Sequence, residues 1–176
     1  TEVSHVRCER VNSLSPFGAT VMQEQGIGIT VEDFDRGVQD GSLAGHVGFH
    51  ESAAMIAKAL SIPYDSLQQQ MLPIITEVDR KSPHGFAAKG HIAGVNMTAQ
   101  ALQGEKEVIS LIHPQQIEPE QVGVDTGDYI TLKGTPPIDM AVKPEVNGGL
   151  GTIAMACNCL PFVVAARPGL LTMLDL

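Results

Sequence analysis

The sequence has 176 residues, enough for one domain with a hydrophobic core, and a formal net charge of −9. The acidic balance disfavours nucleic acid and anionic membrane as partners, and the 4% content of aromatic residues disfavours a stacking surface for single-stranded nucleic acid. Three cysteines give neither a disulfide framework nor zinc-finger spacing, so they indicate buried free thiols in a reducing cytoplasm.

Helix signals occur first in the N-terminal half of the chain. Thr30-Val-Glu-Asp33 has the pattern of a capping box, which predicts a helix up to about Gln39 that ends at Gly41. Residues 51–60 have apolar side chains at helical spacing and predict a second, amphipathic helix. Residues 65–70 predict one further turn of helix.

Strand signals dominate the middle of the chain. Alternating or apolar runs are separated by loops, which include residues 12–28 and 79–89. Gly104-Glu-Lys106 favours a hairpin turn, and Pro73 favours an edge strand or a bulge because proline donates no hydrogen bond to a sheet. The predicted strands lie at residues 3–11, 71–78, 91–103, 107–113, 129–133 and 138–143.

The longest apolar run lies near the C-terminal end of the sequence. Residues 152–166 predict a buried core helix that Pro161 kinks or breaks and that ends before Pro168-Gly169. The run is too short and too interrupted to predict a membrane span. Glycines at 148–151 leave backbone N–H groups open at the start of this helix, and such an end can also bind a carboxylate or a phosphate.

Together these elements predict a single α+β domain over residues 1–176. Hairpins outnumber parallel crossovers, so we expect a mixed, mainly antiparallel sheet of about five strands with helices on one face. A sheet with two partly apolar faces needs cover from a helix or from a second subunit. We therefore expect a homodimer or a homotetramer.

The common catalytic and nucleotide-binding motifs are missing from the sequence. It has no Gly-x-Gly-x-x-Gly after a strand and no P-loop, so it holds no complete nucleotide-binding unit. His46 and His50 are four residues apart, but Gly45 and Gly48 disfavour a helix there. Because a metal site needs three or four converging ligands, we expect no metal site.

Polar side chains do gather among glycines in three loops, at residues 15–28, 45–52 and 113–127. Loops of this kind often present binding groups on a rigid sheet. The polar residues in them either bind a ligand or only satisfy local backbone groups and water, and the sequence leaves both interpretations open. These residues are Glu24, His46, His50 and His113.

Six ordered runs resemble a known family. They are SPFGATVM, GHVGFHES, HPQQ, GDYI, PEVNGGLGTIA and ARPGLLTMLDL, and together they resemble the 2,4-diaminopentanoate dehydrogenase family of dihydrodipicolinate-reductase-like proteins over essentially the whole chain. Proteins of this family are about twice as long, with an N-terminal Rossmann domain for NAD or NADP. The resemblance implies that this chain is the second half alone, a cytoplasmic α+β substrate-binding and assembly domain whose sequence lacks the Rossmann domain.

The resemblance also separates two branches. Dihydrodipicolinate reductase has a His-His-x-x-x-Lys run shortly before a Pro-Ser-Gly-Thr-Ala loop. The matching loop here is Pro16-Phe-Gly-Ala-Thr20, and the residues before it, Arg7 to Ser15, contain neither His nor Lys. We therefore favour the amino-acid dehydrogenase branch, whose reaction is reversible oxidative deamination.

This reaction defines the groups that a substrate site needs. A histidine would move protons, a carboxylate would bind a substrate ammonium, and open backbone N–H groups would bind the substrate carboxylate. The expected catalytic residues are His46 and His113, and the expected substrate-binding residues are Ser15, Gly18, Thr20, Glu24, Glu51, Asn147, Gly149 and Thr152.

A second hypothesis comes from a different class of protein. The chain is also compatible with a free-standing small-molecule-binding or oligomerisation module that has no catalytic activity. Upstream coding sequence with a Rossmann fingerprint would favour the dehydrogenase half over this alternative.

Overall fold

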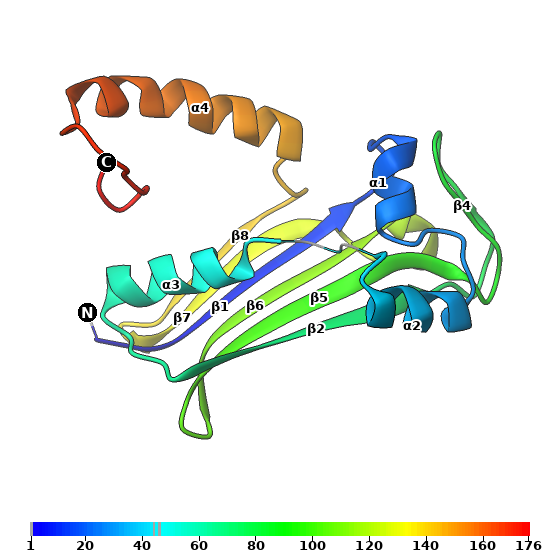
Figure 1. The fold of residues 1–176 in the computed structure, drawn as a ribbon, viewed down its shortest axis with the longest axis horizontal. Coiled ribbons are helices and arrows are strands. Elements are labelled where there is room, and N and C mark those ends of the chain that lie inside the picture. The colour runs from blue at the N-terminus through cyan, green and yellow to red at the C-terminus, as the bar shows by residue number, and fades with distance from the viewer. Residues whose placement is uncertain (1, 44, 46) are drawn as a thin grey trace.

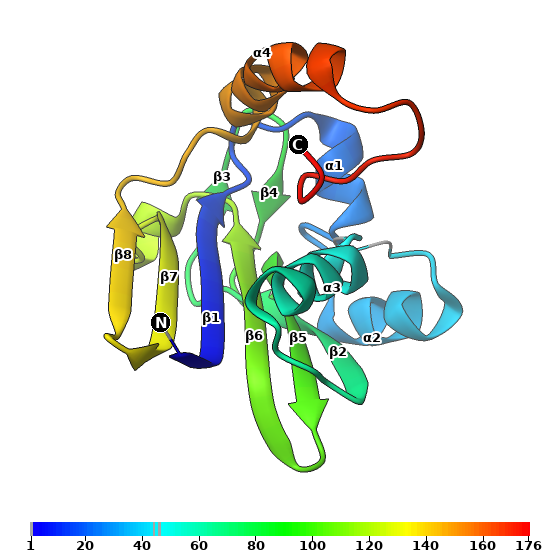
Figure 2. The same cartoon turned by 90° about the vertical axis from the view of Figure 1, so that its left-hand side faces the viewer.

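The computed structural model describes residues 2–43, 45 and 47–176. Its main feature is a six-stranded sheet in the order β2-β5-β6-β1-β7-β8, which Figure 2 shows from one side. Only the contact between β1 and β6 is parallel, and the other four strand pairs are antiparallel. The strands of this sheet are β1 (Glu2–Ser13), β2 (Ser66–Ile75), β5 (Ile92–Gln103), β6 (Lys106–Gln116), β7 (Gly127–Thr135) and β8 (Ile138–Val142).

The helices lie on one side of this sheet, and the other side carries no helix among the described residues (Figure 1). This arrangement confirms the predicted α+β class with a mixed, mainly antiparallel sheet. The sheet has six strands where about five were expected. The helices are α1 (Ala19–Glu24), α2 (Val31–Asp40), α3 (Phe49–Leu60) and α4 (Gly148–Ala165), with a short 3₁₀ turn at Pro119–Val122.

Helix α2 begins and ends where the sequence predicts. The Thr30 hydroxyl accepts a hydrogen bond from the Asp33 backbone N–H at 3.1 Å, which satisfies one donor of the first turn. Gly41 follows the helix with a φ of 75°, a conformation that glycine adopts without strain. The amphipathic pattern turns Phe34 into the core between helix and sheet.

The main core lies between the central strands and helices α2 and α3. Strands β5 and β6 contribute most of the core residues, because the positions of these strands that face the core carry mainly small or branched apolar side chains. Its fully or nearly fully buried members are Val6, Phe34, Phe49, Ala53, Ile62, Ile92, Val95, Met97, Ala99, Ala101, Val108, Ile109 and Leu111.

Three local predictions in the first half of the chain are wrong. Residues 65–70 form no helical turn. Strand β2 begins at Ser66, and Leu67 and Met71 point to the core from this edge strand. Helix α1 lies inside the predicted loop 12–28, held by the burial of Met22. The predicted loop 79–89 contains a small hairpin of β3 (Arg80–Lys81) and β4 (Phe86–Ala87).

The expectation of a buried, interrupted C-terminal helix is also wrong. Helix α4 runs from Gly148 to Ala165 through Pro161, and none of its residues is buried. Apolar composition indicates that a surface needs cover, but it does not say where the cover comes from. The three cysteines are also less buried than expected. Cys157 on α4 is exposed, and Cys8 and Cys159 are half-buried.

Candidate functional site

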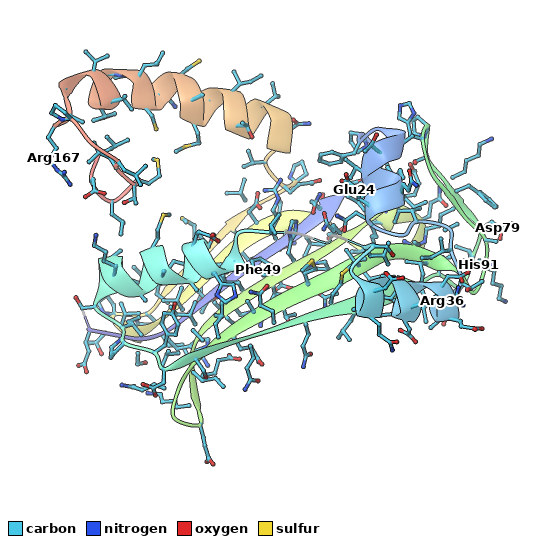
Figure 3. All side chains as sticks on the ribbon, in the orientation of Figure 1. Glu24, Arg36, Phe49, Asp79, His91 and Arg167 are labelled. Carbon is cyan, nitrogen blue, oxygen red and sulfur yellow. The ribbon has the colours of Figure 1, made fainter. Side chains whose placement is uncertain are left out.

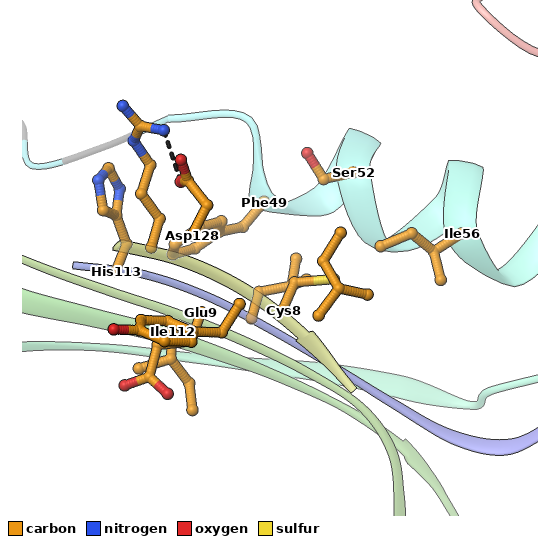
Figure 4. A pocket seen from close by; sticks show the side chains of 12 residues that line it. Cys8, Glu9, Phe49, Ser52, Ile56, Ile112, His113 and Asp128 are labelled. Carbon is orange, nitrogen blue, oxygen red and sulfur yellow. Dashed lines mark hydrogen bonds and ion pairs between the residues drawn. The ribbon is translucent and has the colours of Figure 1, made fainter. Parts of the chain in front are cut away.

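Two adjoining cavities lie on the helix-covered side of the sheet. The larger, of about 640 Å³, lies between the sheet, α1 and the first turns of α4, and the smaller, of about 410 Å³, lies between the sheet and α3 (Figure 4). Both are lined by Arg10 and His113, so these two side chains stand where the cavities meet. The larger is also lined by Asn12, Leu14, Phe17, Val21, Glu24, Gln25, Gln115, Val146, Gly148, Gly151, Thr152 and Met155.

Strand alternation brings the polar lining together. Arg10 and Asn12 are two residues apart on β1, so both side chains point to the same face of the sheet. In the register of the sheet Arg10 pairs with Asp128 on β7, and Asn12 pairs with Gln115 on β6. His113 lies two residues before Gln115 and shares its face. Three neighbouring strands thus supply the polar floor of the site.

Arg10 connects the sheet to the segment that leads into α4. Its guanidinium donates from Nη1 to Asp128 Oδ1 at 2.6 Å and from Nη2 to the Val146 carbonyl oxygen at 2.6 Å. Asp128 accepts a further hydrogen bond from the Val146 N–H at 2.8 Å through Oδ2. Glu145 accepts from the Ser13 N–H at 3.1 Å. These charge-assisted bonds fix the position of the α4 N-terminus over the larger cavity.

His113 is buried beside this pair and is oriented by Asn12. Its Nε2 lies 2.7 Å from Asn12 Oδ1. A carboxamide oxygen only accepts hydrogen bonds, so Nε2 carries a proton in this contact. The Asn12 amide in turn donates to the Ser13 carbonyl oxygen at 3.3 Å. The ring is therefore held in one orientation at the junction of the two cavities.

Two buried glutamines extend the polar floor toward α1. The Gln115 amide donates to Gln25 Oε1 at 3.2 Å, and the Gln25 amide donates to the Gly45 carbonyl oxygen at 3.2 Å. Glu24 precedes Gln25 at the end of α1 (Figure 3). Its side chain adds a carboxylate to the lining of the larger cavity. The cavity thus combines a cation, a carboxylate, an imidazole and carboxamides.

The start of α4 adds backbone donors to the same cavity. Asn147 caps the helix, because its Oδ1 accepts from the Leu150 N–H at 3.0 Å. Gly148 and Gly151 line the cavity without a side chain between the helix backbone and the open space. The positive end of the helix dipole therefore borders the site, and such an end favours an anionic group.

The cavity beside α3 is mostly apolar. Phe49 and Ile56 of α3 face Leu111 and Ile130 of the sheet across it. Cys8 also lines this space, and desolvation by burial raises the pKa of its thiol. This part of the site suits an aliphatic portion of a ligand.

The structure brings several of the predicted site residues to this place. His113, Glu24 and Thr152 line the larger cavity. Asn147 and Gly149 line a small adjacent cleft of about 210 Å³ with Arg10 and Asn12.

Other predicted residues lie elsewhere. The Ser15 hydroxyl accepts from the Glu118 N–H at 2.8 Å and supports its loop, and Gly18 precedes the first turn of α1. Thr20 and Glu51 are exposed on α1 and α3, and neither is among the lining residues of the two cavities. His46 lies outside the described residues. The roles proposed for all of these residues stay predictions.

Sequence reasoning missed five polar residues of the site, namely Arg10, Asn12, Gln25, Gln115 and Asp128. Arg10 lies on the same face of β1 as Val6 and Cys8, and a charged residue at such a position in an apolar alternation is a usable signal for an inward-facing cation. Gln115 and Asp128 lie inside the HPQQ and GDYI runs, where no periodic pattern marks them. The predicted loop 12–28 includes Asn12, although β1 extends through this residue.

Comparison with known proteins gives consistent matches. A solved structure of an amine dehydrogenase from Mycobacterium smegmatis matches with a TM-score of 0.78 at 20% identity, covering 97% of this chain and 50% of that one. A 2,4-diaminopentanoate dehydrogenase of Acetoanaerobium sticklandii is 57% identical over 176 residues, which is 99% of this chain and 50% of that protein. The chain thus spans about half the length of each.

The family model for the 2,4-diaminopentanoate dehydrogenase C-terminal domain matches residues 1–176, which is every residue of the sequence. Together with the 57% identical relative, this match shows that the chain belongs to the 2,4-diaminopentanoate dehydrogenase C-terminal domain family.

Proposed function

We propose that this chain is the substrate-binding and assembly half of a cytoplasmic, NAD- or NADP-dependent dehydrogenase that oxidatively deaminates a small diamino acid. The observation that carries the proposal is the larger cavity, where an arginine, a carboxylate, a fixed histidine and a helix N-terminus meet within a domain of this family. A diamino acid carries two ammonium groups and one carboxylate, and the lining of the cavity offers a partner of the right charge for each kind.

The anionic end of such a substrate would bind near Arg10 and the start of α4. The Arg10 guanidinium has five donor hydrogens, and its bonds to Asp128 and Val146 use two of them. The Gly148–Gly151 turn adds the positive end of the helix. Glu24, which also lines the larger cavity, would bind an ammonium group by a charge-assisted hydrogen bond.

His113 is the residue that we propose for proton transfer. Oxidation at a carbon bearing an amine releases protons as the iminium forms and water attacks it, and histidine is the side chain that exchanges protons near neutral pH. Asn12 fixes the ring, so the proton would be exchanged at a defined place.

The nicotinamide itself, when bound, would accept the hydride from the carbon that bears the amine. Dinucleotide phosphates are held by a strand, a glycine loop and a helix in sequence, and these 176 residues contain no such fingerprint. We therefore assign no cofactor-binding residue to this chain, and we propose that the remaining half of the polypeptide holds the cofactor.

Assembly into a homodimer or homotetramer through the helix-free face of the sheet belongs to the same proposal. A sheet face without a covering helix needs cover from a second subunit, and the described residues place no helix on this face. Leu72 on the same face is 49% exposed. Light scattering of the full-length protein at micromolar concentration should show a dimer or a tetramer, and a monomer would contradict this part.

The activity is tested with the full-length protein by following amine-dependent reduction of NAD or NADP. Glu24→Gln should lower kcat/KM for a diamino acid at least tenfold, which is about 1.4 kcal/mol of transition-state stabilisation, while KM for the nicotinamide stays near the wild-type value. Glu105→Gln is the matched control, because Glu105 is exposed at the turn between β5 and β6 and lines neither cavity. No reduction of either nucleotide with any diamino acid would refute the proposed function.

A further inference from the structure

Helix α4 exposes apolar side chains all round, among them Met155, Phe162 and Val163, and one row of them is regularly spaced. Leu150, Ile153, Cys157, Leu160 and Val164 recur at spacings of three and four residues, and each is exposed, Val164 at 85%. Because an α-helix advances about 100° per residue, these five side chains lie within a sector of about 80°. We call this row the outward stripe.

The opposite side of α4 faces the domain. Thr152 and Met155 line the larger cavity, and Cys159 Sγ lies 4.0 Å from Met173 Sδ in the C-terminal segment. This segment folds back below α4 toward α3 (Figures 1 and 2). Helical geometry places these positions roughly opposite the outward stripe. Among the described residues, nothing buries the stripe.

The spacing of the stripe indicates what kind of surface it fits. Alternating steps of three and four residues are the pattern by which one helix packs its side chains between those of another. The stripe extends about 21 Å along the axis at 1.5 Å per residue, which is the length of a normal helix contact. Helix α4 has no charged residue between Gly148 and Ala165. An exposed apolar row of this size on a folded domain marks an interaction site.

A membrane is a poor occupant, although α4 is long and apolar enough by length and composition. The bonds from Arg10 and Asp128 to Val146 hold its first turn against the polar floor of the cavity. Its inner side borders polar groups that a bilayer would leave without partners.

We infer that the outward stripe is the docking surface for a helix of the cofactor-binding half of the same polypeptide. The inference rests on the proposed function, in which this chain is one half of a dehydrogenase. The 2,4-diaminopentanoate dehydrogenase of Acetoanaerobium sticklandii is about twice as long, and this chain matches 50% of it as the C-terminal domain. A half of that size has room for a helix of this length on its surface.

Docking on the outward stripe would also affect the candidate site, because α4 borders the larger cavity. The first turn of α4 is fixed over the larger cavity by Arg10, so a body that packs on the outward stripe is held next to the cavity mouth. Docking there would bring the nicotinamide-bearing half and the substrate groups together in one geometry.

Thiol labelling of the full-length protein tests the inference, because Cys157 lies in the middle of the stripe. The native protein is treated with a maleimide, and each cysteine is followed by mass spectrometry of its peptide. Glu105→Cys, at the exposed turn between β5 and β6 and remote from α4, provides the reference rate. Cys157 should react at least about tenfold more slowly than the reference thiol, and equal rates would overturn the inference.

The same labelling separates the other half of the chain from a second copy. If the cofactor half covers Cys157, its protection persists when the protein is diluted until light scattering shows a monomer. If protection disappears with the monomer, a second copy covers the stripe and the inference is wrong.

A second experiment uses charge within the stripe. A protease site is inserted before Thr1 in the full-length protein, and the two halves are followed by gel filtration after cleavage. Wild-type halves should elute together, whereas Ile153→Asp with Leu160→Asp should separate them. Val38→Asp, at an exposed apolar position on α2, is the control and should leave them together. Halves that stay together despite both aspartates would overturn the inference.

These readouts are independent of catalysis. Docking can be confirmed in a protein that deaminates no amine, and activity can be found in a protein whose halves meet elsewhere. Failure of the proposed function and failure of the docking inference are therefore distinguishable.

Discussion

The Arg10 guanidinium on β1 and the Asp128 carboxylate on β7 lie 2.6 Å apart, and both also bind the backbone of Val146. One residue of the loop before α4 is thus held through its N–H and its carbonyl oxygen by two neighbouring strands. Because the loop is fixed at this point, the sheet determines where the first turn of α4 stands, and that turn borders the larger cavity. The ion pair therefore connects the rigid sheet to the part of the site that is built from helix backbone.

Replacing Asp128 should loosen α4 while the sheet remains folded. Asp128→Ala removes both the partner of Arg10 and the acceptor for the Val146 N–H. Hydrogen bonds to charged groups contribute about 1.5–3 kcal/mol when buried, and this pair is partly exposed, so we expect a loss of about 1–2 kcal/mol. Urea unfolding measures the loss, and hydrogen exchange at the amides of residues 148–152 should become faster.

Arg7→Ala is the matched control for that variant. Arg7 and Glu9 form an ion pair of 2.7 Å on the same strand, but it is exposed and holds no loop. An exposed pair contributes about 0–1 kcal/mol, and exchange in α4 should not change. Equal exchange rates in Asp128→Ala and the wild type would show that α4 is held by other contacts.

Asn12 should control the pH dependence of catalysis through His113. Asn12→Asp places a carboxylate where the carboxamide oxygen lies 2.7 Å from His113 Nε2. A carboxylate stabilises the imidazolium form, so the acidic limb of the kcat/KM profile of the full-length enzyme should move to higher pH. Asn96→Asp on the helix-free face is the control and should leave the profile in place. An unchanged profile in Asn12→Asp would exclude His113 as the proton-transferring group.

Glu107 should contribute stability that is lost in acid. Desolvation acts to raise the pKa of Glu107, but hydrogen bonds from Ser110, His5 and Gln100 outweigh it and lower the pKa below the ordinary value of 4.5. A carboxyl group with a lowered folded-state pKa stabilises the fold above its unfolded pKa, and this contribution disappears as the pH falls through the folded-state pKa.

Unfolding of Glu107→Gln measures this contribution. The variant should be less stable than the wild type at pH 7, and the difference should shrink steadily below about pH 4.5. Glu105→Gln, at the exposed turn between β5 and β6, serves as the control and should show little difference at either pH. A difference for Glu107→Gln that stays constant with pH would contradict the assigned linkage.

Local chemistry made part of this fold predictable. The capping residue Thr30 and the terminating Gly41 define α2 from within a few residues, so the sequence locates that helix correctly. The turn at Gly104 and the edge position of Pro73 follow from backbone requirements of the same local kind.

Features that depend on distant partners could not be predicted in the same way. The sequence of residues 66–70 predicts a helical turn, and only the pairing with β5 identifies a strand. In this edge strand the alternation of apolar and polar side chains is weak. The ion pair between Arg10 and Asp128 could not be predicted, because it depends on the register of β1 against β7. These two strands are separated by more than a hundred residues in the sequence. Helix α4 is apolar, but none of its residues is buried in this domain, so apolar composition alone does not predict burial.

The last prediction concerns Arg80, whose side chain is buried beneath the β3–β4 hairpin. Its Nε donates to Thr76 Oγ1 at 2.8 Å, and its Nη1 donates to Gln116 Oε1 at 2.5 Å and to the Ile117 carbonyl oxygen at 3.1 Å. Desolvation lowers the pKa of Arg80, and the charge of Glu120 opposes this effect. The guanidinium thus ties the hairpin to the end of β6, next to Gln115 in the floor of the site.

Arg80→Met keeps much of the side-chain length but removes all of these donors. It leaves the Gln116 side chain and the Ile117 carbonyl oxygen buried without their partner, so we expect a loss of about 2–4 kcal/mol in the free energy of unfolding. Arg80→Lys should lose less, because an ammonium group can still donate to one or two of the three acceptors. Lys81→Met changes the neighbouring exposed residue and should stay within about 0.5 kcal/mol of the wild type. Urea unfolding at pH 7 measures all three, and a stability of Arg80→Met equal to that of Lys81→Met would show that the buried guanidinium is not what holds the hairpin to β6.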